Sequence, residues 1–144
     1  MPVDINWAAV ILATVVNMAL GAAWYSPLLF AKPWTAGVEK SIGKEGFERI
    51  KQNMRGPTAA RTYGLTAVGA FLLAYVMGLF VDYKGADSIA EGAMIGAVAW
   101  LGFVAATSLN TVLFEGRSRR VYVITSAQFL VAFVVSGAIL GLWQ

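Results

Sequence analysis

The chain has 144 residues, of which 58% are hydrophobic and 13% are charged, with a net charge of +3. A soluble domain has about 25% charged and at most about 50% apolar residues, so this composition is typical of a membrane protein. Cysteine and histidine are both absent, which excludes disulfides, thiolate chemistry and the usual zinc ligands. We expect no cofactor and no bound metal.

Four stretches without Asp, Glu, Lys, Arg or His approach or exceed the length of about 20 residues that spans a bilayer. These predicted spans are residues 5–29, 62–81, 92–113 and 121–143. They leave no room for a soluble domain, so residues 1–144 are expected to form a single membrane domain. The first stretch lacks the cationic start of a signal peptide and follows Asp4, so we interpret it as a retained helix.

The segment WYSPLLFAKPW (24–34) marks the predicted end of the first helix. Pro27 removes a backbone donor and restrains Ser26, and Pro33 prevents a clean continuation. Aromatic rings are common at the headgroup level of a bilayer. The expected interface anchors are Trp24, Tyr25, Trp34 and Trp143. A role in partner binding or gating is the alternative for the 24–34 segment.

The predicted loop at 30–61 is the longest polar segment and carries seven basic residues. Within it, Phe47, Ile50 and Met54 form one stripe of a short helix. The loop therefore contains a candidate amphipathic helix that would lie on the inner leaflet, with basic residues near anionic lipid. A solvated linker helix is the alternative, because three acids dilute the positive charge.

The loops between the predicted spans carry seven, one and three basic residues in turn. Cytoplasmic loops of membrane proteins are enriched in Lys and Arg. The first and third loops are therefore predicted to be cytoplasmic, and both termini are predicted to lie on the non-cytoplasmic side.

The second and fourth predicted helices resemble each other. RTYGLTA (61–67) aligns with RVYVITS (120–126), and FLLAYV (71–76) aligns with FLVAFV (129–134). This pattern predicts two duplicated helical hairpins that run parallel, related by an axis near the membrane normal. Chance similarity between apolar helices is the alternative.

Small residues recur on one face of each predicted helix. Helices in lipid associate through close backbone approach and interhelical hydrogen bonds, because burial of apolar side chains gains little there. The candidate packing residues are Ala9, Ala13, Asn17, Gly21, Ala70, Ala74, Gly78, Gly92, Gly96, Gly137 and Gly141. These faces could close the bundle, form a homo-oligomer or contact another membrane protein, and the sequence leaves open which face does which.

Uncharged polar residues gather in the predicted cytoplasmic half of the helices. One interpretation is a polar vestibule for a lipid headgroup or small solute, lined by Thr66, Asn110, Thr125, Gln128, Glu115 and Arg117. The alternative is that Ser and Thr bond to their own backbone while amides bridge helices. In LFEGRS (113–118), Glu115 is expected to form an ion pair with a neighbouring arginine, and Gly116 suits a helix C-cap.

All eight acids lie outside the predicted spans, and the chain has no G-x-S-x-G elbow, Walker loop or metal-ligand spacing. The sequence therefore predicts a protein that is not an enzyme. Ion-coupled transport is also disfavoured, because such transporters keep an ionisable residue within the bilayer.

Five segments resemble a family of small four-helix bacterial integral membrane proteins that is catalogued as a domain of unknown function. They are INWAAV (5–10), WYSPLLF (24–30), WLGFVA (100–105), LFEGRS (113–118) and GAILGLW (137–143). The resemblance covers nearly the whole chain and implies a four-span architecture. It implies no activity and no functional residues.

The sequence thus predicts an all-α, four-span protein of the bacterial inner membrane. The predicted function is that of a non-enzymatic accessory subunit or small oligomer, acting through helix–helix and lipid contacts. The expected partners are membrane lipids and either further copies of the chain or another membrane protein, with no nucleic acid. The alternative is a facilitative transporter or channel for a small neutral or anionic molecule.

Overall fold

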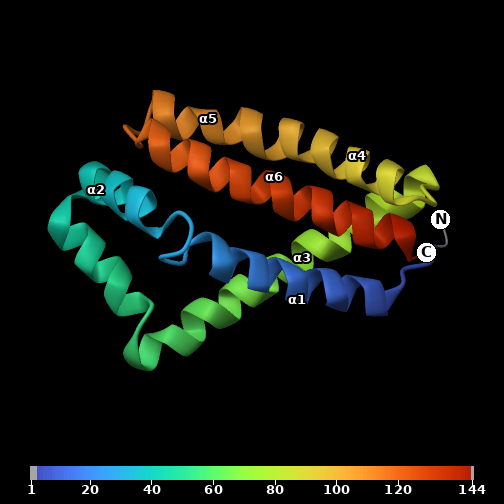
Figure 1. The fold of residues 1–144 in the computed structure, drawn as a ribbon, viewed down its shortest axis with the longest axis horizontal. Coiled ribbons are helices and arrows are strands. Elements are labelled where there is room, and N and C mark those ends of the chain that lie inside the picture. Colours follow the sequence, from blue (N-terminus) through green and yellow to red (C-terminus); the bar gives the residue numbers. More distant parts are fainter. Residues whose placement is uncertain (1–2, 144) are drawn as a thin grey trace.

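The structure is a computed structural model that describes residues 3–143, and the regular elements in that range are all helical (Figure 1). They are α1 (Trp7–Trp24), α2 (Ala31–Asn53), η1 (Gly56–Thr58), α3 (Ala59–Lys84), α4 (Ile89–Trp100), η2 (Leu101–Ala105), α5 (Ala106–Leu113) and α6 (Arg119–Leu142). Four helical stretches are long and apolar enough to cross a membrane, namely Trp7–Trp24, Gly56–Lys84, Ile89–Leu113 and Arg119–Leu142. The prediction of an all-helical protein with four such stretches is confirmed.

The two basic loops lie together at one end of the bundle. Figure 1 shows α2 at the end opposite to the start of α1 and the end of α6. There the Ser118 backbone N–H donates to the Ser41 hydroxyl at 3.0 Å, which joins α2 to the loop before α6. A Cβ placed on Gly37 would lie 2.6 Å from a methyl carbon of Val121, so the first half of α2 packs closely on α6.

The closest packing in the fold joins α4 to α6. A Cβ placed on Gly92 would lie 2.0 Å from the carbonyl oxygen of Gly137, and one placed on Gly96 would lie 2.2 Å from that of Phe133. Gly141 is equally constrained, since its Cβ would approach the Ser88 carbonyl oxygen to 2.5 Å. The two main chains are therefore in direct contact, which is the approach that helix association in lipid requires.

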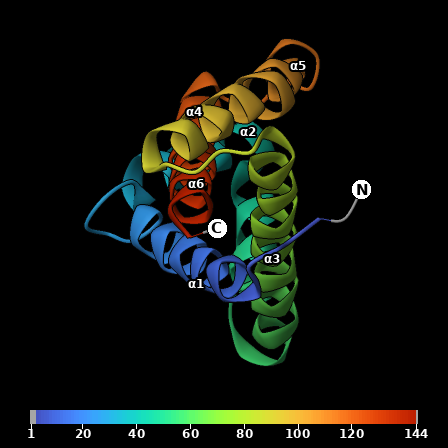
Figure 2. The same cartoon turned by 90° about the vertical axis from the view of Figure 1, so that its right-hand side faces the viewer.

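A second contact region joins α1, α3 and α6 near the ends of the chain. Figure 2 shows α6 at the centre, with α4, α1 and α3 around it. Val10, Met77 and Leu140, one from each of the three helices, are almost completely buried, and Val10 and Leu140 meet over Gly78. The apolar core therefore occupies the half of the bundle far from α2.

The first half of α3 leaves this core. Figure 1 shows α3 diverging from α1 toward the α2 end, and no residue from 59 to 72 is buried. A Cβ placed on Gly64 or on Gly69 would have no atom within 4 Å beyond those of its own stretch of helix. The rest of the chain therefore covers little of the surface of this half of the helix.

The first loop is helical over most of its length and bends within α2. α2 bends at Gly43, whose φ of 77° and ψ of 169° favour glycine. The bend brings Phe47 into a cluster with Val38 and Val121, where it is buried, while Ile50 packs at the edge. The apolar stripe predicted to face lipid thus has its largest residue turned toward the protein.

We expect Gly92→Ala to lower the free energy of unfolding by about 1–3 kcal/mol, because the new methyl would force two main chains apart. Gly69→Ala should instead leave stability unchanged or raise it by up to about 1 kcal/mol, since the site is open and alanine favours helix. Unfolding in SDS, followed by tryptophan fluorescence, measures both. Equal effects of the two substitutions would contradict the close α4–α6 contact.

Candidate functional site

Helix α6 organises the polar contacts of the bundle. Among the described residues, each side-chain hydrogen bond between two spanning stretches has α6 as one partner. These bonds come from α1, α4 and η2, which lie on different sides of α6 (Figure 2). The polar residues along α6 are therefore the first candidates for a functional site.

Two tryptophans hold α1 and α4 against α6. The Trp24 indole N–H donates to the Ile124 carbonyl at 3.1 Å, and the Trp100 indole N–H donates to the Ser126 carbonyl at 2.8 Å. Carbonyls two residues apart lie on nearly opposite sides of a helix, because each residue turns the helix by about 100°. Trp24, predicted as an interface anchor, is thus also an interhelical donor, and Trp100 was not singled out from the sequence.

Asn17, near the middle of α1, joins this helix to the last third of α6. Its side-chain nitrogen donates to the Ser136 hydroxyl at 2.8 Å, and both residues are buried. The Asn17 side-chain oxygen has no hydrogen-bond partner among the described residues. A buried acceptor without a donor costs about 1–3 kcal/mol, so this atom is destabilising within the chain alone.

Two further polar side chains on α6 are buried without hydrogen bonds. Gln128 is only 8% exposed, and its amide makes no hydrogen bond within residues 3–143. The Ser126 hydroxyl is also unpartnered. Gln128 and Ser136 belong to one row of buried residues with four-residue spacing, which continues to Leu140. This row, which we call the polar row of α6, thus brings two polar side chains, Gln128 and Ser136, inside the bundle.

The third spanning stretch contains a π-helical segment, η2, that sequence analysis did not predict. Three consecutive carbonyls in or at the end of this segment accept hydrogen bonds from side-chain hydroxyls. Thr107 donates to Phe103 at 2.6 Å, Ser108 donates to Val104, and Tyr122 of α6 donates to Ala105 at 2.9 Å. These hydroxyls therefore satisfy the local backbone, and a π segment is often found near functional positions.

The candidate vestibule residues do not converge on one cavity. Thr66 lies on the exposed half of α3 and bonds to its own helix at the Thr62 carbonyl, 2.9 Å away. Asn110 is exposed on α5, on a different side of the molecule (Figure 1). Gln128 is buried, and Thr125 meets the Tyr25 side chain. The six residues therefore occupy separate environments.

The LFEGRS segment forms a turn without the expected ion pair. Glu115 and Arg117 are both exposed, and the one salt bridge found within residues 3–143 joins Lys51 to Glu48. Gly116 has a φ of 66°, which lets the Arg117 N–H return to the Thr111 carbonyl at 3.0 Å. The segment closes the end of α5, as expected for a glycine at a helix terminus.

The aromatic residues after α1 form a small cluster with α2. The ring centroids of Tyr25 and Trp34 are 5.2 Å apart, and those of Trp34 and Phe47 are 6.5 Å apart. Burial raises the pKa of the Tyr25 hydroxyl, and the smaller effect of its hydrogen bond with Thr125 is to lower that pKa. Trp143 lies at the other end of the bundle and is about half exposed.

The predicted packing residues differ in their surroundings. Those that lie buried are Ala9, Ala13, Asn17, Ala74, Gly78, Gly92, Gly96, Gly137 and Gly141. Gly21 and Ala70 are only half buried, and a Cβ on Gly21 would meet no atom within 4 Å. Packing is therefore close at the centre of the bundle and absent where α1 and α3 diverge.

One face of the third spanning stretch is exposed. We name it the α5 outer face and define it by Gly102, Ala106 and Asn110, which follow each other at four-residue spacing and are all exposed. A Cβ on Gly102 would meet no atom within 4 Å. Met94 and Val98 of α4 are each more than 60% exposed, so the outward surface continues along α4.

A model of the family described as "Protein of unknown function (DUF1761)" matches residues 8–141. The chain belongs to the DUF1761 family. The resemblance to a catalogued domain of unknown function is thereby confirmed, and the match extends over nearly all of the four spanning stretches. No curated protein and no solved structure matches this DUF1761 chain.

In this DUF1761 protein, we expect the Asn17→Ala and Ser136→Ala substitutions to be coupled by about 0.6 kcal/mol, as is usual for hydrogen bonds between helices in lipid. A double-mutant cycle on the free energy of unfolding in SDS measures the coupling. Thr14→Ala with Ser136→Ala is the control cycle, because Thr14 bonds to its own helix at Val10. Equal couplings in the two cycles would contradict the Asn17–Ser136 bond.

Proposed function

We propose that this protein is a non-enzymatic membrane protein that acts by assembling through helix–helix contacts, as a small oligomer or as an accessory subunit of a larger complex. The observation that carries the proposal is the α5 outer face, where small and amide residues lie exposed on a helix apolar enough to span a membrane. Membrane lipids and a second membrane-embedded helix are its expected partners.

The α4–α6 contact indicates how this chain uses its small residues. Gly92 and Gly137 meet main chain to main chain, whereas Gly102 meets nothing within 4 Å. Asn110 lies two turns beyond Gly102, and an amide facing lipid gains from a partner on another helix. The α5 outer face therefore has the chemistry of a helix-packing surface without a helix packed on it.

The exposed area supports the same proposal. The chain exposes 9058 Å², whereas a compact monomer of 15.4 kDa would expose about 7,200 Å². The difference of about 1,900 Å² is more than the area of about 800 Å² that each partner buries in a stable protein–protein interface. A single copy therefore has enough surplus surface for contacts with a neighbour.

We place the protein in the bacterial inner membrane, with both termini on the non-cytoplasmic side. The support is the position of the two basic loops, which meet at one end of the bundle where Ser41 contacts Ser118. Basic loops that share an end belong on the cytoplasmic side.

We also propose that the two hairpins arose by duplication. Matched positions in the FLLAYV and FLVAFV segments have similar surroundings, since Ala74 and Ala132 are both buried. One turn further along, Gly78 and Ser136 occupy equivalent positions and are also both buried.

The test of assembly is the mass of the protein extracted from its native membrane in a mild detergent. We expect a dimer, a small oligomer or a defined larger complex for the unmodified chain. Ala106→Leu should reduce the association constant by about tenfold, equivalent to about 1.4 kcal/mol, because a large side chain would prevent close helix approach. Gly64→Leu is the matched control at an open site on α3 and should leave the mass unchanged. A monomeric unmodified chain would rule the proposal out.

Facilitative passage of a small neutral or anionic molecule is a second candidate function. It is favoured by the Gln128 side chain, which is only 8% exposed and makes no hydrogen bond within residues 3–143, and by the buried Asn17 side-chain oxygen, which has no partner there. A small polar solute could satisfy such groups, which lie on facing helices of the bundle.

Under the assembly proposal, proteoliposomes should pass glycerol and chloride no faster than protein-free liposomes. A flux that the protein adds and that Gln128→Leu removes would instead establish passage through the bundle. Thr66→Val is the control, because Thr66 lies on the exposed half of α3.

A further inference from the structure

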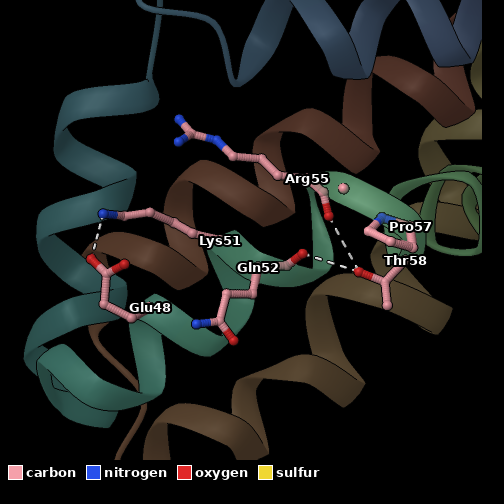
Figure 3. Close-up of a pocket in the computed structure, with 7 residues that line it drawn as sticks. Glu48, Lys51, Gln52, Arg55, Pro57 and Thr58 are labelled. Carbon is pink, nitrogen blue, oxygen red and sulfur yellow. Dashed lines mark hydrogen bonds and ion pairs between the residues drawn. The ribbon is translucent and has the colours of Figure 1, made fainter.

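A pocket lies at the turn between α2 and α3, outside the polar row of α6 (Figure 3). Its volume is about 470 Å³, and it is lined by the last turn of α2 and by η1. The turn directly precedes the long helix α3, at the start of the candidate span Gly56–Lys84. A pocket in this position would lie at the level of the lipid headgroups.

The charged groups that line the pocket are Glu48, Lys51 and Arg55, so its net charge is positive. Lys51 pairs with Glu48 at 2.5 Å and also lies over the Phe47 ring, 5.2 Å from its centre. The Arg55 guanidinium has no ion pair or hydrogen bond within residues 3–143, and in Figure 3 no dashed line reaches it. An unpaired guanidinium is a planar fork of donors that matches a phosphate group.

The short helix η1, which leads into α3, forms the other wall of the pocket. Thr58, at the N-cap, makes no side-chain cap, because its hydroxyl donates to the Gln52 carbonyl at 3.0 Å. The Ala59 N–H donates to the Gly56 carbonyl, so η1 and α3 form one continuous helical stretch whose start at Gly56 favours negative charge. The Gln52 amide also lines the pocket and makes no side-chain hydrogen bond, but Figure 3 shows it on the other side of the last α2 turn from the Arg55 guanidinium, so Arg55 is the main donor.

An apolar surface continues from the pocket along α3. Leu65, Val68 and Leu72 are each more than 50% exposed, on the half of α3 that has left the core. Gly64 and Gly69 leave open space beside them. The pocket and this surface together offer a charged site for a headgroup and an adjoining face for acyl chains.

We propose that the α2–α3 pocket binds the phosphate of an anionic phospholipid through Arg55, with the acyl chains lying along the exposed first half of α3. The phosphate of a zwitterionic lipid carries a cationic group beside it, which gains nothing from a positively charged pocket. This site is separate from the α5 outer face, so it does not depend on the proposed assembly.

The test uses the full chain purified in a mild detergent and native mass spectrometry of bound lipids. Phosphatidylglycerol, phosphatidylcholine and inorganic phosphate are added in turn to the same preparation. We expect more phosphatidylglycerol than phosphatidylcholine to be retained, and inorganic phosphate at equal concentration should not displace it. Arg55→Gln should weaken phosphatidylglycerol binding about fivefold, the effect expected of one cation near anionic lipid.

Arg119→Gln is the matched control. It removes the same charge from an exposed position at the same end of the bundle, outside the pocket. Equal losses for Arg55→Gln and Arg119→Gln would overturn the proposal, because general attraction to the basic end would then explain the binding. Equal retention of both lipids would also overturn it, and displacement by inorganic phosphate would assign the pocket to a free anion instead.

Discussion

The main-chain contact between α4 and α6 is the constraint on which the rest of the fold depends. In lipid there is little hydrophobic gain from packing one helix against another, so association needs unusually close approach. Gly92 and Gly137 provide it, since a Cβ on either would lie 2.0 Å from the carbonyl oxygen of the other. No rotation of α4 about its axis preserves this contact, so the facing surfaces of the two helices are fixed. The α6 carbonyls that accept the two indole N–H groups are fixed with them.

The remaining helices attach to this pair in a different way. α1 reaches α6 through Asn17 and Trp24, two hydrogen bonds well separated along the helix. α3 contributes Met77 and Val81 to the buried core near the ends of the chain, but nothing from its first half. Cohesion is therefore greatest at the centre and at the end that holds the termini. The α2 end is held mainly by the contacts of α2 with the start of α6.

The parts of this architecture that follow from local sequence were predictable, and those that depend on helix crossing were not. The four apolar stretches are visible directly, because hydropathy and the absence of charge are properties of each segment alone. Small residues mark where a helix can be approached, but the same spacing occurs at Gly92, which is in main-chain contact, and at Gly21, which meets nothing. The bend at Gly43 turns Phe47 inward. The π segment accepts a hydrogen bond from the Tyr122 hydroxyl, and Tyr122 belongs to another helix.

The open glycines indicate where the chain is incomplete by itself. Glycine within a helix is about 0.8–1.0 kcal/mol less favourable than alanine, so its presence needs a compensating contact. Between α4 and α6 the direct meeting of the main chains supplies that compensation. Gly102 has no such contact within the chain, and it lies beside Ala106 and Asn110, where a second helix could approach as closely as α4 approaches α6. Gly64 and Gly69 lie on a helix half exposed on nearly all sides, a surface irregular enough for acyl chains to fill. Under the two proposals, protein contacts and lipid contacts would cover different faces of one fold, and neither face includes the glycines that hold α4 to α6.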